Sequence, residues 1–347
     1  MHEGLSQHTD ILSSPSYQLY LDCALALNEA EGRGFWSTDF TQGEQFLRLQ
    51  GTQAIDTNSV VAKLNHVTVD RDFIFKMDAH NAAQAANEIG FLQGIAPNVI
   101  KGLHTQGHQV VVPGVVHNSV TGKHPWMIQE FIAGKPASAE PYKLDAGALT
   151  PRHIEGLCAF IKTCSRLDLG TVEQEGGLRL GEDDSFRVFQ SNLDHYGKDA
   201  IVGALGPALY GKMSELLANL QFIFTDQAQI FSLGDVNACN MIKVSNECLG
   251  LIDFTSVGTI NNPAYDYGFL LESLSVEPPL QKHFIYTALR ANQDVPYFKD
   301  LLRVTFIYSG VINKIRRAYA RGDMEQVLWS KQQIEDALLG RGVWEYY

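Results

Sequence analysis

The sequence predicts an α+β protein with two lobes, a small β-rich N-terminal lobe that contains one long helix and a larger helical C-terminal lobe. Short β-prone runs separated by polar turns occupy the chain from Phe46 to Ile132, interrupted by one alanine-rich stretch. Beyond Pro136 the apolar residues recur at helical spacing instead. The 347 residues are enough for two lobes, which we place at residues 1–132 and 133–347.

The N-terminal lobe is expected to begin with an additional helix over residues 17–31. Strands are then predicted at residues 46–53, 60–67, 71–77, 109–116 and 126–132. Between the third and fourth of these strands, the alanine-rich run predicts a helix over residues 81–94, with Asp78 or Asn81 as its N-cap. The helix therefore follows directly after the third strand.

The C-terminal lobe is expected to be helical around a single β-hairpin. Helices are predicted at residues 151–167, 194–204, 211–222, 279–291, 297–319 and 324–339. A Ser-Asn-Glu turn separates two short strands at residues 241–244 and 250–254. Since a tight hairpin brings its two ends together, residues before its first strand should lie near residues at the end of its second.

The composition narrows the class of protein. Apolar residues make up 45% of the chain and charged residues 19%, which is typical of a globular protein with a core. The formal net charge of −12 argues against nucleic acid or an anionic membrane as the main partner, and is compatible with a cationic or neutral substrate. The N-terminus lacks a signal-peptide pattern, and no apolar run approaches the roughly 20 residues that span a bilayer. Five cysteines without paired spacing favour free thiols, so we expect a cytoplasmic protein.

The stretch around the predicted hairpin carries the strongest chemical signal. Asp235 and Asn240 form a D-x4-N motif in the loop before the first strand, and Asp253 ends the second strand. The hairpin allows all three side chains to converge. Phosphoryl transfer requires such a group, because one carboxylate orients the hydroxyl nucleophile while a second carboxylate and an amide oxygen hold Mg²⁺.

Two further signals lie in the predicted N-terminal lobe. Lys76 is flanked by apolar strand residues, which is unusual unless its ammonium group is paired, and Glu88 in the following helix is a suitable partner. Such a pair would direct Lys76 toward the α- and β-phosphates of a nucleotide. The strand that ends at residue 132 runs into a glycine-containing linker, where the backbone of Glu130 and Ile132 could hydrogen-bond an adenine edge.

The order of these features resembles the protein-kinase-like fold, and in detail the aminoglycoside phosphotransferase and choline-kinase-like family. The signature of that family is H-x-D-x4-N, then I-D after a short hairpin, then a D-P-x-Y-D-like segment. The corresponding segments here are LGDVNACN at 233–240, ID at 252–253 and NPAYD at 262–266, and the resemblance covers about residues 46–271. The resemblance implies that Asp235 is the catalytic base and that Asn240 and Asp253 are Mg²⁺ ligands. It also implies that Lys76 and Glu88 position the phosphates and that Asp266 braces the catalytic loop.

The chain departs from the family pattern at two places. Leu233 stands where the family has a histidine that chiefly braces the loop. The substitution therefore removes a bracing group, whereas every reacting group is retained. The turn that should cover the phosphates spans residues 54–59 and contains no glycine. Its candidate phosphate-binding residues are Asp56, Thr57, Asn58 and Ser59. Its small polar residues could still donate backbone N–H groups to phosphate, although the acidic Asp56 is not ideal there.

The sequence thus predicts an O-phosphotransferase that uses ATP (or GTP) and Mg²⁺ to phosphorylate a hydroxyl of a small molecule, with an aminoglycoside-type antibiotic as the first acceptor hypothesis. Choline, ethanolamine, homoserine, a sugar or a macrolide remain alternatives, because the nucleotide site does not determine the acceptor pocket. Leu233 and the glycine-free turn leave a second alternative, a pseudokinase-like binding module. Phosphorylation of proteins is disfavoured, because no activation segment separates Asp253 from Asn262.

An acidic cluster in the predicted C-terminal lobe has two interpretations. Its members are Glu173, Glu175, Glu182, Asp183 and Asp184. Acidic clusters of this kind are usually solvated loops, and the functional alternative is a patch that attracts a cationic acceptor such as an aminoglycoside.

Overall fold

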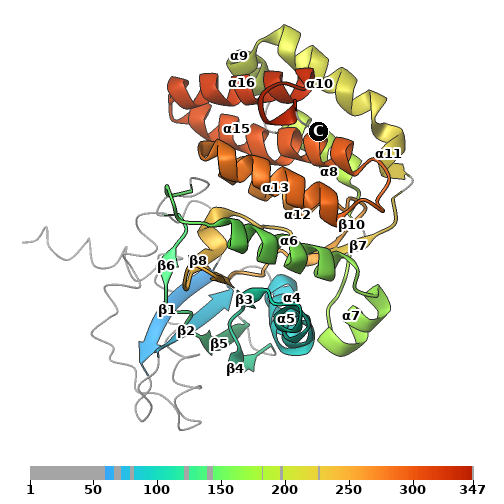
Figure 1. The fold of residues 1–347 in the computed structure, drawn as a ribbon. Helices are drawn as coiled ribbons and strands as arrows, with labels where there is room; N and C mark the ends of the chain where they lie inside the picture. The colour runs from blue at the N-terminus through green and yellow to red at the C-terminus, as the bar shows by residue number, and fades with distance from the viewer. Residues whose placement is uncertain are drawn as a thin grey trace, which may run out of the picture. The chain divides into compact units, whose positions relative to one another are not determined.

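The computed structural model describes residues 59–65, 72–78, 82–120, 125–138, 144–181, 183–195, 198–225 and 227–345. The chain forms two compact units (Figure 1). The first unit takes its residues from Met1–Gln93 and Pro113–Ile132, and the second from Gly94–Val112 and Ala133–Tyr347. The helix predicted over 17–31 and the strand predicted over 46–53 lie outside the described residues.

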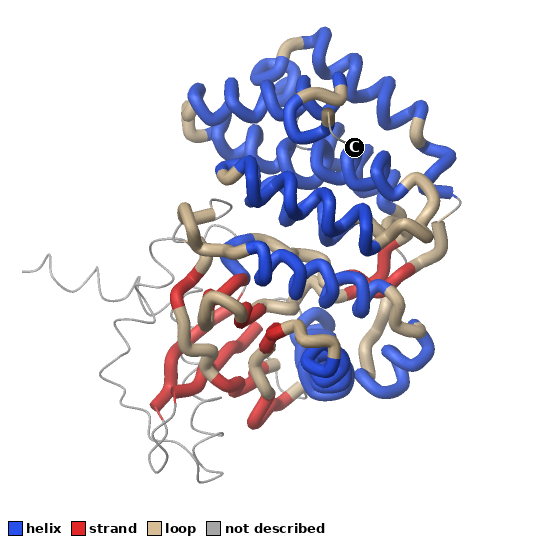
Figure 2. Tube along the Cα trace, viewed as in Figure 1, coloured by secondary structure: helices blue, strands red, loops and turns tan. Residues whose placement is uncertain are grey.

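The first unit contains a four-stranded antiparallel sheet, whose strands are drawn in red in Figure 2. The strands are β1 (Ser59–Asn65), β2 (Asp72–Asp78), β4 (Val115–Ser119) and β5 (Trp126–Glu130), in the spatial order β1-β2-β5-β4. Phe73, Phe75 and Met77 alternate along β2 and are all buried, so this face of the strand forms the core of the unit. Helix α4 (Ala82–Gly90) follows β2 and contacts it.

The helix predicted over 81–94 continues well beyond its predicted end. After α4 it passes through a π-helical turn (Phe91–Ile95) into α5 (Ala96–Thr105), which belongs to the second unit. The single strand predicted over 109–116 was wrong, because the chain there forms two strands in different sheets, β3 (Gln109–Val111) and β4. The break falls at Pro113 and Gly114, where proline lacks the N–H that a ladder needs.

The second unit contains two small sheets that hold its central loops. The larger has the order β3-β9-β8-β6, with β6 (Lys135–Pro136), β8 (Met241–Lys243) and β9 (Cys248–Leu251). Strands β8 and β9 form the predicted hairpin, and β3 pairs with β9 in parallel. The smaller sheet pairs β7 (Ile230–Ser232) with β10 (Gly258–Ile260) antiparallel.

Helices form most of the second unit (Figure 1). Besides α5, the α-helices described in this unit are α6 (Pro151–Ser165), α7 (Leu169–Gly176), α8 (Ser185–His195), α9 (Lys198–Leu205), α10 (Pro207–Asn219), α11 (Gln221–Thr225), α12 (Tyr265–Ser273), α13 (Pro278–Ala291), α14 (Phe298–Thr305), α15 (Ile312–Ala320) and α16 (Met324–Leu339). Sequence periodicity did not predict α12, because it is buried on nearly all sides and contacts α6, α13 and α14. Among the described residues, no helix combines the length and the apolar character needed to cross a membrane.

Candidate active site

The loop that carries Asp235 begins at the end of β7 and is held by a buried carboxylate on α12. Asp266 accepts hydrogen bonds from the hydroxyl of Ser232 at 2.8 Å, the backbone N–H of Leu233 at 2.9 Å and that of Gly234 at 3.0 Å. Burial raises the pKa of Asp266, while these three donors act in the opposite direction. The resemblance predicted that Asp266 braces the catalytic loop. Its three hydrogen bonds join α12 to the start of that loop.

Gly234 brings this loop against the segment that follows Asp253. Its φ of 80° lies in the left-handed region, and a Cβ at this position would lie 2.1 Å from the backbone oxygen of Ser256. Only glycine satisfies both conditions without moving the backbone. The two loops that carry Asp235 and Asp253 are therefore packed in direct backbone contact.

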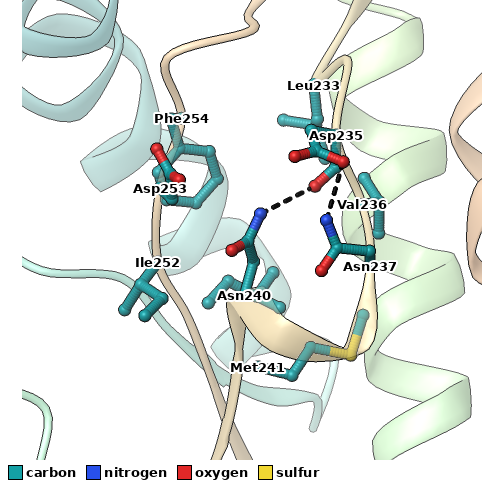
Figure 3. Close-up of a pocket in the computed structure, with 10 residues that line it drawn as sticks. Leu233, Asp235, Val236, Asn237, Asn240, Met241, Ile252, Asp253 and Phe254 are labelled. Carbon is teal, nitrogen blue, oxygen red and sulfur yellow. Dashed lines mark hydrogen bonds between the residues drawn. The ribbon is translucent and has the colours of Figure 1, made fainter. Parts of the chain in front are cut away.

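Asn240 ends a 3-10 turn (Ala238–Asn240) that directly precedes β8. Its side-chain Nδ2 donates to the backbone oxygen of Asp235 at 3.0 Å, and its own backbone oxygen accepts from the N–H of Ile252 at 3.0 Å. The first bond turns the amide oxygen of Asn240 away from Asp235, as Figure 3 shows. The second ties the end of the loop to the exit of β9.

Asp253 follows β9 in an unusual backbone conformation. Its φ is 62°, and the hydroxyl of Thr255 donates to its Oδ1 at 2.8 Å. A non-glycine residue in the left-handed region costs on the order of 1 kcal/mol and persists only where the surroundings enforce it, which is common at functional sites. Asp253 lines the same pocket as Asp235.

Asp235, Asn240 and Asp253 line a single small pocket of the second unit (Figure 3). The remaining lining residues are mostly apolar: Leu233, Val236, Asn237, Met241, Leu251, Ile252 and Phe254. Desolvation raises the pKa of Asp235, and the negative charge of Asp253 raises it further. Hydrogen bonds from Asn237 and Asn240 and the charge of Arg317 lower it.

The donor groups of this pocket fit Mg²⁺. The Asn240 amide oxygen and the Asp253 carboxylate are hard oxygen ligands, and Mg²⁺ is usually bound by one or two such groups together with substrate phosphates. Within the described ranges, no group of three or more His, Cys, Asp or Glu side chains could hold an ion. A nucleotide-bound Mg²⁺ needs no such cage.

The first unit contains the predicted pair of Lys76 and Glu88. The Lys76 Nζ lies 3.0 Å from Oε1 and 2.9 Å from Oε2 of Glu88, which is a bidentate ion pair between β2 and α4. The side chains are 9% and 1% exposed. The pairing inferred from the sequence is therefore present, and the role of Lys76 toward phosphates stays a prediction.

The other predicted nucleotide-binding residues fall in different places. Glu130 ends β5, where its backbone N–H donates to the oxygen of Gly114 at 2.9 Å and its carboxylate accepts from the Gly114 N–H at 3.3 Å. Ile132 lies in the connection from β5 to β6. Ser59 is the first residue of β1, whereas Asp56, Thr57 and Asn58 lie outside the described residues.

Two residues near Asp235 were not predicted from the sequence. Asn237 donates to the Asp235 carboxylate, and the only sequence signal for it is a polar residue two positions after the aspartate. Arg317 acts on Asp235 from α15, far along the chain, so no local pattern could have identified it.

The fold is the protein-kinase-like α+β fold of small-molecule phosphotransferases. The GDP and kanamycin complex of APH(2")-IIIa superposes with a TM-score of 0.55 at 14% identity, covering 85% of this chain and 99% of that chain. A macrolide 2'-phosphotransferase, MphH from Brachybacterium faecium, gives a TM-score of 0.52 at 14% identity, covering 81% of this chain and 90% of that chain. An aminoglycoside phosphotransferase from Alicyclobacillus acidocaldarius gives a TM-score of 0.53 at 14% identity, covering 82% of this chain and 89% of that chain. No family model and no curated protein matches the sequence.

Proposed function

We propose that this protein is an O-phosphotransferase that moves the γ-phosphate of ATP or GTP onto a hydroxyl of a small molecule with the help of Mg²⁺. The observation that carries the proposal is the convergence of Asp235, Asn240 and Asp253 in one pocket. A carboxylate base beside an amide and a second carboxylate is the set that phosphoryl transfer uses. The likeness in fold to aminoglycoside and macrolide phosphotransferases supports it.

Each residue of the pocket has a distinct task in this reaction. Asp235 orients the acceptor hydroxyl and accepts its proton while the oxygen–phosphorus bond forms and the bond from the γ-phosphorus to its leaving oxygen breaks. Asn240 and Asp253 would hold Mg²⁺, which supplies positive charge against the phosphate oxygens when bound. The ion pair with Glu88 would orient Lys76 toward the α- and β-phosphates.

The donor is a purine nucleotide in this proposal. The APH(2")-IIIa structures contain GDP, which supports ATP or GTP as alternatives. The backbone oxygen of Glu130 and the backbone of Ile132 would bind the purine edge, since the Glu130 N–H already donates to Gly114. The segment from Asp56 to Ser59 would cover the phosphates.

An aminoglycoside-type antibiotic is the first acceptor to test. The kanamycin in the APH(2")-IIIa complex and the net charge of −12 support a cationic acceptor. A macrolide is the next, in view of the likeness to MphH. Choline, ethanolamine, homoserine and sugars complete the panel, because related folds accept different substrates.

The first experiment measures acceptor-dependent ADP or GDP release across this panel, with Asp235→Ala as the test variant. We expect the variant to lose at least about 100-fold in turnover, because general-base catalysis contributes about 10²–10⁴-fold. Nucleotide affinity, measured by calorimetry, should be unchanged. Asp194→Ala on the exposed face of α8 is the matched control and should keep full turnover. Equal turnover of Asp235→Ala and wild type would refute the assigned base.

The pseudokinase-like alternative keeps one supporting observation, the buried Leu233 at the histidine position of the signature. It predicts a folded protein that binds nucleotide weakly or without Mg²⁺ and transfers no phosphate to any acceptor. Acceptor-dependent release that requires Asp235 would exclude it.

A further inference from the structure

Asn237 is a buried residue whose amide group is used at both ends. It is 3% exposed. Its Nδ2 donates to Oδ1 of Asp235 at 2.7 Å, and its Oδ1 accepts from the backbone N–H of Cys239 at 2.8 Å. Since a backbone N–H can only donate, the amide oxygen must face Cys239 and the NH₂ group must face Asp235.

Asn237 could cap the turn without its hydrogen bond to Asp235. Asn237 caps the 3-10 turn Ala238–Asn240 with its side-chain oxygen. A cap needs only an acceptor, and serine or aspartate supplies one equally well. The NH₂ group on Asp235 is therefore a separate feature of asparagine at this position.

The geometry of the pocket shows what this donor does to the carboxylate. With Oδ1 of Asp235 bound to Asn237, the other carboxylate oxygen lies on the side that faces Asp253 in Figure 3. The same asparagine caps the turn that ends at Asn240, whose side chain in turn bonds the backbone of Asp235. A rotation of Asp235 would break a buried hydrogen bond, which costs about 1–3 kcal/mol.

Leu233 cannot supply this orientation, although it lines the same pocket. It is 3% exposed, and a leucine side chain has no donor or acceptor. The polar contacts that hold the loop come instead from Asp266 at its start and from Asn237 beyond Asp235.

We propose that Asn237 is a positioning residue that holds one oxygen of Asp235 and so presents the other to the acceptor hydroxyl, a direct role that a loop-bracing histidine at position 233 would not supply. This inference rests on the proposed phosphotransferase function. Asn237 is neutral, so it orients the base without adding charge to it. An aspartate at position 237 would keep the cap and place a second carboxylate against Asp235, which is unfavourable.

Asn237→Ser and Asn237→Asp separate the two roles of the residue, because both keep an oxygen acceptor for the cap and both remove the NH₂ group that reaches Asp235. Ionised aspartate has no donor, and the serine hydroxyl sits on a shorter side chain. We expect Asn237→Ser to lower kcat about 10-fold, a part of the general-base contribution, with the KM for nucleotide within about 2-fold. Asn237→Asp should lower kcat further. Both variants should lose some stability, Asn237→Asp more than Asn237→Ser, because a buried hydrogen bond to Asp235 is lost and the aspartate adds a like charge beside it, so kcat is compared per folded molecule. Asn219→Ser at the exposed end of α10 is the matched control and should change nothing.

Crystal structures of wild type and Asn237→Ser give a readout that does not depend on turnover. We expect the Asp235 side chain to leave its present orientation in the variant while the turn Ala238–Asn240 is retained. An unchanged Asp235 would overturn the inference even if no acceptor were found, whereas absence of wild-type turnover on every acceptor would refute the proposed function alone. An unchanged kcat in Asn237→Ser would also overturn it.

Leu233→His supplies the remaining test. We expect it not to raise the kcat of wild type and not to restore that of Asn237→Ser, because the imidazole braces the loop and does not contact the carboxylate oxygen. Restoration to the wild-type kcat would show that a general brace is sufficient, and would overturn the direct role of Asn237.

Discussion

Each unit contains a buried lysine–glutamate pair, and the two pairs differ in what surrounds them. In the first unit Lys76 binds Glu88 in a bidentate pair between β2 and α4. In the second unit the Lys314 Nζ lies 2.5 Å from Oε1 of Glu272, between α15 and α12, and 4.5 Å from the ring centre of Trp329 on α16. The first pair joins β2 and α4, which are consecutive in the chain, and the second joins helices that are distant in sequence.

This comparison shows that burial of an ion pair does not by itself indicate catalysis. Both glutamates are almost fully buried, with side-chain exposures of 1% for Glu88 and 3% for Glu272. Buried pairs often contribute little net stability, yet removal of one partner is costly. Lys314 also packs on an aromatic ring, which is typical of a structural contact. We therefore expect a packing role for Lys314, whereas the role of Lys76 toward phosphates remains part of the proposed function.

The largest expected effect is the loss of stability in Lys314→Met. Removal of the lysine leaves Glu272 buried without its partner, so the free energy of unfolding should fall by about 3–5 kcal/mol. Denaturant unfolding measures it, and Lys331→Met on α16 is the control. A loss below about 1 kcal/mol would show that the pair is not structurally important.

The deficit of Lys314→Met should depend on pH. Burial raises the pKa of Glu272, and the charges of Lys314 and Arg317 act against this, so removal of Lys314 raises that pKa further. A raised folded-state pKa means that the folded state binds more protons, and its stability falls as pH rises through that pKa. Unfolding at pH 5 and pH 8 should therefore show the larger deficit at pH 8. A deficit independent of pH would contradict the burial of an ionised Glu272.

The next effect is the loss of activity in Lys76→Met. If Lys76 orients the phosphates, turnover should fall by about 100-fold or more, or about 3 kcal/mol in transition-state stabilisation. Assays are to be run at a temperature where the variant is folded, as judged by circular dichroism. Lys101→Met on the exposed side of α5 is the control. Full turnover per folded molecule would remove Lys76 from the proposed site.

The smallest change in stability is expected from double variants that replace both partners of a pair. Replacement of both partners by apolar residues is often nearly neutral, so Lys314→Met/Glu272→Leu and Lys76→Met/Glu88→Leu should each recover stability to within about 1–2 kcal/mol of wild type. Lys314→Met/Glu272→Leu should then have the turnover of wild type, whereas Lys76→Met/Glu88→Leu should remain as inactive as Lys76→Met. Recovery of turnover in both would show that the two pairs have the same, purely structural role.

The sequence predicted the features that depend on local order. The strand with Lys76, the helix with Glu88, the D-x4-N loop and the hairpin to Asp253 all follow from patterns within about 20 residues, and the structure contains each of them. The alternation of buried residues in β2 and the polar turn of the hairpin are short-range signals, which is why they can be found in a single chain.

Errors in the sequence analysis occurred where local patterns were ambiguous. Residues 109–116 are rich in valine, and the Pro113-Gly114 pair, which is unfavourable in a strand, divides them between two sheets. The hydrophobic periodicity of the sequence did not reveal α12, because this helix is buried on nearly all sides and so lacks the alternation of polar and apolar faces.

The identity and order of the candidate reacting groups can be read from the sequence alone, because short-range spacing places them on a strand, a helix and a hairpin. How these groups are held depends mainly on contacts between elements that are far apart in the chain. The spacing of residues in the sequence does not encode the geometry of these contacts. They are the bond from the Leu233 N–H to Asp266, the bond from Asn237 to Asp235, the close approach of Ser256 to Gly234 and the ion pair of Lys314 with Glu272. The physical reason is that a hydrogen bond or an ion pair depends on distances of a few tenths of an ångström, and these are set by the packing of elements far apart in the chain.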